Sequence, residues 1–122
     1  MKQNAVFLGA TVLLGAVASS SVRAEQDVCD WLASQARQIM KARQYGYEMS
    51  KALAQVRELA TRIEQDAEAD GAAGAGATVG RWLESMVDHA YERPRFSTDQ
   101  YRQDAITDFA SNAMLDCRRA FK

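Results

Sequence analysis

Apolar residues recur every three or four positions through most of the chain after residue 25, which is the spacing of one face of a helix. The first such stretch predicts a helix over residues 26–44. Asp27 is its expected N-cap, because a carboxylate there can accept free backbone N–H groups. Gly46 can take the left-handed conformation that ends a helix. The apolar face consists of Val28, Trp31, Leu32, Ala36, Ile39 and Met40.

Three later stretches predict three more helices. One begins near Ser50, a possible cap, and fades by residue 70, and the next covers residues 78 or 79 to 91. The last begins at Ser97, since Ser97 and Gln100 have capping-box spacing. No stretch alternates as a half-buried strand would, so we predict an all-α bundle of about four helices. The apolar face of the last helix consists of Tyr101, Ala105, Ile106, Phe109, Ala113, Met114, Cys117 and Phe121.

Residues 71–80 contain four glycines and separate the second and third predicted helices. We interpret this Gly/Ala-rich segment as a flexible connector. A phosphate-binding loop would need a preceding strand and a Lys-Ser or Lys-Thr pair after the last glycine. An acidic helical stretch precedes the glycines and Arg81-Trp82 follows them, so the context of a nucleotide site is missing.

Residues 1–24 have the organisation of a secretory signal peptide. Lys2 provides a positive start, residues 5–18 are apolar and uncharged, and Ala24 is a suitable residue before the cleavage site. The apolar run has 14 residues, whereas a spanning helix needs about 20. We therefore predict cleavage after Ala24, a helical domain over residues 25–122, export to the periplasm, and no stable membrane insertion afterwards.

The chain has two cysteines, and an exported protein with an even cysteine count is normally oxidised. We predict one disulfide between Cys29 and Cys117. Cys29 lies at the start of the first predicted helix and Cys117 near the end of the last. An up-down-up-down bundle would bring them level, although another arrangement of four or five helices could also do so.

Charge and site chemistry argue against several classes of function. Without residues 1–24 the chain has 13 basic and 16 acidic groups. A net charge of −3 provides little electrostatic attraction to the phosphate backbone of nucleic acid. His89 has Ser85 four residues before it, but a single helix provides no oxyanion hole. One histidine without a CxxC pair provides no zinc site. We predict a protein that is not an enzyme and needs no cofactor, with methionines that serve packing and not copper binding: Met40, Met49, Met86 and Met114.

Two segments are candidates for contact with a partner. Tyr91, Arg93, Arg95 and Phe96 surround Pro94, and aromatic residues and arginine are enriched at protein interfaces. A second candidate segment contains Arg43, Gln44 and Tyr45. The sequence favours the plainer interpretation of residues 91–96, a tight turn between helices with Tyr91 and Phe96 packed inward, since turn chemistry already accounts for proline and serine here.

Two blocks of the sequence form a recognisable pattern. The first block contains Cys29, Ile39-Met40, Arg43-Gln44 and Gly46. The second contains Ala90-Tyr91-Glu92, Pro94, Phe96-Ser97-Thr98, Tyr101, Ala105-Ile106, Asp108-Phe109, Cys117 and Ala120. Together they resemble a family of small uncharacterised exported two-cysteine helical proteins of Gram-negative bacteria and their phages. The resemblance implies a periplasmic helical domain and no particular activity. The segment over residues 71–80 is longer than the corresponding link in the family.

Our leading expectation is a non-enzymatic periplasmic protein that binds or regulates another envelope protein. An alternative is a small chaperone for acid or envelope stress, because many carboxylates would become protonated at low pH and leave a positive chain that can open. A third is phage-type interference with lysis or superinfection. The sequence does not distinguish these functions.

Overall fold

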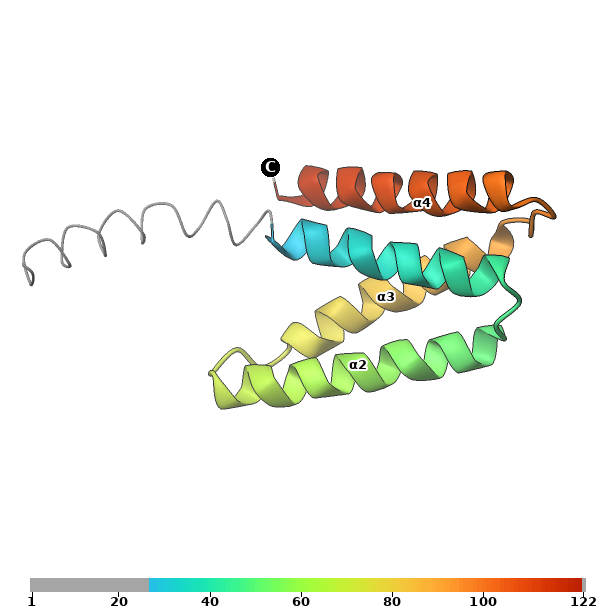
Figure 1. Cartoon of the computed structure of the whole chain (residues 1–122). Helices are drawn as coiled ribbons and strands as arrows, with labels where there is room; N and C mark the ends of the chain where they lie inside the picture. The colour runs from blue at the N-terminus through green and yellow to red at the C-terminus, as the bar shows by residue number, and fades with distance from the viewer. Residues whose placement is uncertain (1–26, 122) are drawn as a thin grey trace, which may run out of the picture.

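The computed structural model describes residues 27–121 as four helices joined by short links. Residues 27–44 form the first helix, followed by α2 (Met49–Ala69), α3 (Ala75–Glu92) and α4 (Asp99–Ala120). Consecutive helices run in opposite directions, and the first helix lies between α4 and α2 (Figure 1). The predicted all-α bundle is confirmed. The predicted signal peptide and its predicted cleavage site lie outside the described residues.

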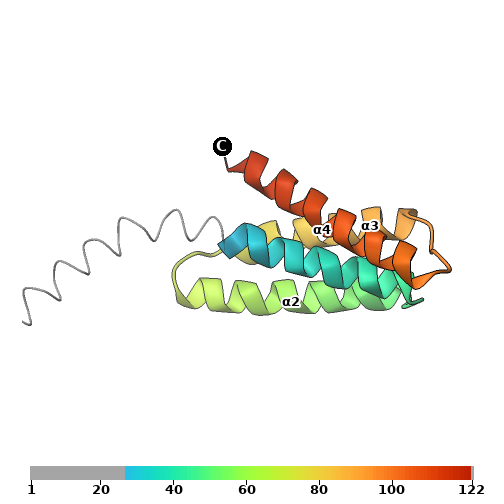
Figure 2. The same ribbon diagram turned by 45° about the horizontal axis from the view of Figure 1, so that its top comes forward.

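The core draws residues from all four helices, and Figure 2 again shows the first helix between α4 and α2. Its fully buried members include Met40, Leu83 and Val87. Burial of these side chains is the main favourable term in the folding of the bundle. The central cluster consists of Ala36, Ile39, Met40, Ala52, Val56, Leu83, Val87, Ala90, Ile106 and Phe109.

The Cys29–Cys117 disulfide is confirmed, with a Cα–Cα distance of 5.5 Å. Both cysteines are buried, and they form a second small cluster with Leu32. The bond joins the beginning of the first helix to the end of α4 (Figure 1) and closes a loop of 88 residues. Loop-closure entropy gives such a crosslink a stabilising effect of about 4.5 kcal/mol.

Two of the predicted helix caps are wrong, Ser50 by two positions and Ser97 by one. Helix α2 begins at Met49 after Glu48, which makes no side-chain cap, so Ser50 is inside the helix. Helix α4 begins after Thr98, whose Oγ1 accepts a hydrogen bond from the Tyr101 N–H at 3.3 Å, so Ser97 is not the cap. Asp27 is itself helical. The residue that caps a helix is the one at which the preceding chain turns into the helix. Tertiary contacts decide the position of that turn.

The predicted connector over residues 71–80 is mostly wrong, because α3 already begins at Ala75. Only residues 70–74 link the two helices, and Gly71 and Gly74 have the left-handed φ values of 79° and 97°. Gly76 is buried in α3, where an added Cβ would lie 2.6 Å from the backbone oxygen of Ala60 in α2. This glycine therefore permits close helix packing and does not supply flexibility.

Several residues predicted to lie on buried faces are exposed. Tyr101 is 60% exposed and Phe121 49%, at opposite ends of α4, and Val28 and Met49 are also exposed. Gln44 is completely buried, although it belongs to a segment predicted to contact a partner. Across residues 27–121, no helix combines the length and apolar character that crossing a bilayer requires.

Candidate functional site

The two predicted partner segments meet at one end of the bundle. The first helix ends there, and the link between α3 and α4 passes beside it (Figure 1). The Nε of Arg43 donates a hydrogen bond to the backbone oxygen of Arg93 at 3.0 Å. We call residues 43–47 together with residues 91–102 the corner. The fold thus joins into one surface two segments that are about fifty positions apart in the sequence.

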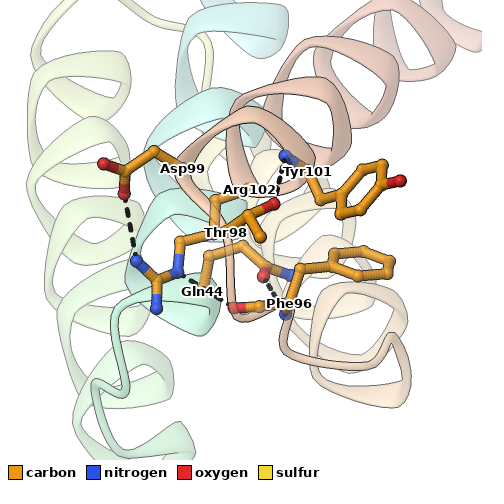
Figure 3. Close-up of polar contacts among 6 residues, drawn as sticks. All are labelled: Gln44, Phe96, Thr98, Asp99, Tyr101 and Arg102. Carbon is orange, nitrogen blue, oxygen red and sulfur yellow. Dashed lines mark hydrogen bonds and ion pairs between the residues drawn. The ribbon is translucent and has the colours of Figure 1, made fainter.

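Gln44 holds the corner together from inside. Its Nε2 donates to the Pro94 carbonyl at 2.9 Å, and its Oε1 accepts from the Phe96 N–H at 2.8 Å. The bond to Phe96 is visible in Figure 3. Arg93 is extended, as a residue before proline should be, so the link presents backbone groups that no helix can pair. One buried amide satisfies two of them and fixes the conformation of the link.

Arg43 and Tyr91 form a second brace. The Arg43 guanidinium lies 5.4 Å from the centre of the Tyr91 ring, and the Tyr91 hydroxyl donates to the backbone oxygen of Tyr47 at 2.7 Å. Burial raises the pKa of Tyr91 and the nearby Arg43 opposes this, with a net upward shift. The phenol therefore keeps its proton at neutral pH and can donate the hydrogen bond.

Arg102 braces the corner from α4, as Figure 3 shows. Its Nε donates to the Phe96 carbonyl at 2.9 Å, and its Nη1 contacts Asp99 at 3.1 Å. Its guanidinium also lies 5.3 Å from the centre of the Tyr45 ring. This role of Arg102 was not predicted, because an arginine on a helix after a capping residue gives no sign of which carbonyl it will reach.

Aromatic rings are exposed on this braced frame. Tyr45 is 50% exposed, Tyr47 40%, Phe96 37% and Tyr101 60%. The rings of Phe96 and Tyr101 are 6.1 Å apart and inclined by 51°, within the range of favourable aromatic pairs. The predicted inward packing of Phe96 is therefore wrong. The prediction of inward packing fits Tyr91 better, since Tyr91 is half-buried.

The six predicted contact residues divide into two groups. Arg43 and Tyr91 serve the internal frame through the contacts above. Tyr45 and Phe96 present rings to the surface, and Arg93 and Arg95 are exposed. Neither arginine forms an ion pair within residues 27–121. The corner can thus offer apolar rings and unpaired positive charge from one rigid surface.

His89 and Ser85 do not form a catalytic pair in this geometry. The His89 Nδ1 is 2.8 Å from the Ser85 backbone oxygen and 3.3 Å from its hydroxyl. A carbonyl can only accept, so Nδ1 carries the proton and cannot take one from the Ser85 hydroxyl. Within residues 27–121, no group of three or more histidine, cysteine or acidic side chains is placed to hold a metal ion.

Comparison with protein-family models, curated proteins and solved structures finds no match to this chain. The resemblance to small exported two-cysteine proteins therefore stays a prediction.

Proposed function

We propose that the protein is a non-enzymatic periplasmic binding protein that docks onto another envelope protein through the corner. The observation that carries this proposal is the exposure of Tyr45, Phe96 and Tyr101 on a frame held by the buried Gln44. The predicted leader and the disulfide support an extracytoplasmic setting, since disulfides persist in oxidising compartments.

Preorganisation is the physical reason why this surface suits binding. Ordering a mobile side chain or loop on association costs roughly 0.5–1.5 kcal/mol per immobilised side chain. Gln44 and Arg102 already fix the backbone of Phe96 through its N–H and its carbonyl. Aromatic side chains also have few rotatable bonds for the contact area that they supply. A partner can therefore use these rings at a low cost in entropy.

The positive charge of the corner indicates which kind of partner surface would bind there. Arg43, Arg93 and Arg95 lie in the corner without a carboxylate at ion-pair distance within the described part of the chain. Of the two acidic residues in the corner, Asp99 is engaged by Arg102 and Glu92 is exposed, so positive charge is in excess. Positive groups around apolar rings favour a partner patch that combines apolar and acidic side chains, because complementary charge speeds and orients the encounter.

Site-specific photo-crosslinking in intact cells tests the proposal. A photoreactive phenylalanine analogue replaces Tyr101 in the corner, and in a matched control it replaces Phe121, which is exposed at the other end of α4. We expect a discrete protein adduct from position 101 that position 121 does not give. Identical adducts from both positions, or no adduct from position 101, would contradict the proposal.

A further inference from the structure

A groove runs between α3 and α4, largely outside the corner. It consists of two adjoining hollows of about 350 and 330 Å³, which share Met86, His89, Ala113 and Asp116. Leu32 of the first helix lines the end nearer the disulfide, and Phe109 lines the other hollow. The groove thus extends along α3 over an apolar floor.

Charged residues flank this floor, and they are mainly positive. Arg81 lines the first hollow, and Arg93 and Arg119 line the second. Among residues 27–121, Asp116 is the only acidic residue that lines either hollow. Its contact with Arg119 is 3.8 Å long and both side chains are about 70% exposed, so water screens it strongly. The groove therefore combines apolar contact with an excess of positive charge.

From the groove's shape and charge we infer that it binds an acidic amphipathic helix of a protein partner. Arg81 and Arg93 are twelve positions apart on or next to α3, which corresponds to about 18 Å at 1.5 Å per residue. An apolar stripe over about three helical turns matches that length. Acidic residues beside the stripe would face the arginines.

A helix suits this groove better than an extended peptide does. One common way for an extended peptide to bind is to add a strand to a sheet edge, and residues 27–121 contain no strand. A helix satisfies its own backbone and needs from the groove only an apolar floor and charges at the rim. This inference goes beyond the proposed function, because it holds whether or not the corner binds anything.

A designed peptide provides the probe for this inference. It has 14 residues, with leucines at helical spacing and glutamates at the other positions, and a control peptide has lysines in place of the glutamates. Fluorescence anisotropy of the labelled peptides with the oxidised full chain gives the dissociation constants. We expect the acidic peptide to bind at least about tenfold more tightly than the basic one, and to weaken as salt is raised.

Matched charge reversals locate the site. The double variant Arg81→Glu, Arg119→Glu should lower the affinity for the acidic peptide by about tenfold, since both residues are exposed at the groove. The control variant Arg37→Glu, Arg62→Glu makes the same change in net charge at exposed positions outside the groove. It should lower the affinity for the acidic peptide by less than about twofold. Equal loss in both variants, or equal affinity for the two peptides, would overturn the inference. Binding to anionic lipid vesicles with no peptide binding would also overturn it.

Discussion

At the scale of single residues, the corner depends on polar side chains that act from inside. Gln44 is fully buried, yet both ends of its amide bond the link between α3 and α4. Arg43, Tyr91 and Arg102 reach three further backbone carbonyls. A sequence pattern identifies such residues only as polar, because the partner groups lie about fifty positions away or on a different element.

Gln44→Leu should destabilise the protein by about 2–4 kcal/mol, since it leaves the Pro94 carbonyl and the Phe96 N–H without their partner. Urea unfolding followed by circular dichroism measures this loss. Gln38→Leu, on the exposed side of the same helix, is the control and should change stability by less than about 0.5 kcal/mol. Similar values for the two variants would show that the amide does not hold the link.

Tyr91 should make stability depend on pH in the alkaline range. Its folded pKa is raised above the ordinary value of 10.0, mainly by burial. A group with a raised folded pKa contributes its full stability below its unfolded pKa and loses it as pH rises through the folded value. Wild type should therefore lose stability more steeply than Tyr91→Phe above pH 10. Tyr101→Phe, at an exposed ring, should follow wild type; parallel curves for wild type and Tyr91→Phe would contradict this account.

At the scale of elements, the period of apolar residues predicted the helices well and their ends less well. Residues that face the core repeat at the expected spacing, as Ala36 and Met40 in the first helix and Leu83, Val87 and Ala90 in α3 illustrate. The start of α3 was missed because Gly76 looks like a linker residue in the sequence. Its packing against α2 depends on a neighbour that the sequence does not identify. Tyr101 was assigned to the core for a related reason, since a helix can extend its apolar face beyond the helices that cover it.

Gly76→Ala tests whether this glycine serves contact or flexibility. Alanine favours a helix over glycine by about 1 kcal/mol, so a substitution in a loose segment should be neutral or stabilising. The added Cβ would overlap Ala60 and Glu64, and we expect a net destabilisation of about 1–3 kcal/mol. Gly80→Ala is the comparison, because its Cβ would meet only the Ala60 Cβ, at 3.1 Å. In thermal unfolding, Gly76→Ala should have a clearly lower midpoint temperature than Gly80→Ala. The reverse order would show that Gly76 is not needed for close packing against α2.

At the scale of the whole molecule, the disulfide and the corner lie at opposite ends of the bundle (Figure 1). The pairing could be predicted from two cysteines and a predicted export signal, and antiparallel packing explains why they meet. The corner could be predicted only as two separate segments. Only the folded structure shows that the two segments lie side by side. Only the structure also shows which residues brace the surface from inside and which form it.

Cys29→Ala with Cys117→Ala should lower the free energy of unfolding by several kcal/mol, up to about 4.5 kcal/mol from loop closure. The four-helix fold should still form in the absence of denaturant, with an unchanged helical circular dichroism signal. Wild type measured with a reducing agent should match the double variant. A reduced protein as stable as the oxidised one would show that the bond contributes nothing to the fold.

The account rests most on the claim that an internal brace creates an external binding surface. Its most direct test is the yield of the photo-crosslinked adduct from position 101 in a Gln44→Leu background, among cells that accumulate equal amounts of oxidised protein. Arg102→Leu is measured alongside as a milder release of the same segment, since it removes the hydrogen bond to the Phe96 carbonyl. We predict that both changes reduce the adduct strongly. An undiminished adduct in both variants would contradict the central claim.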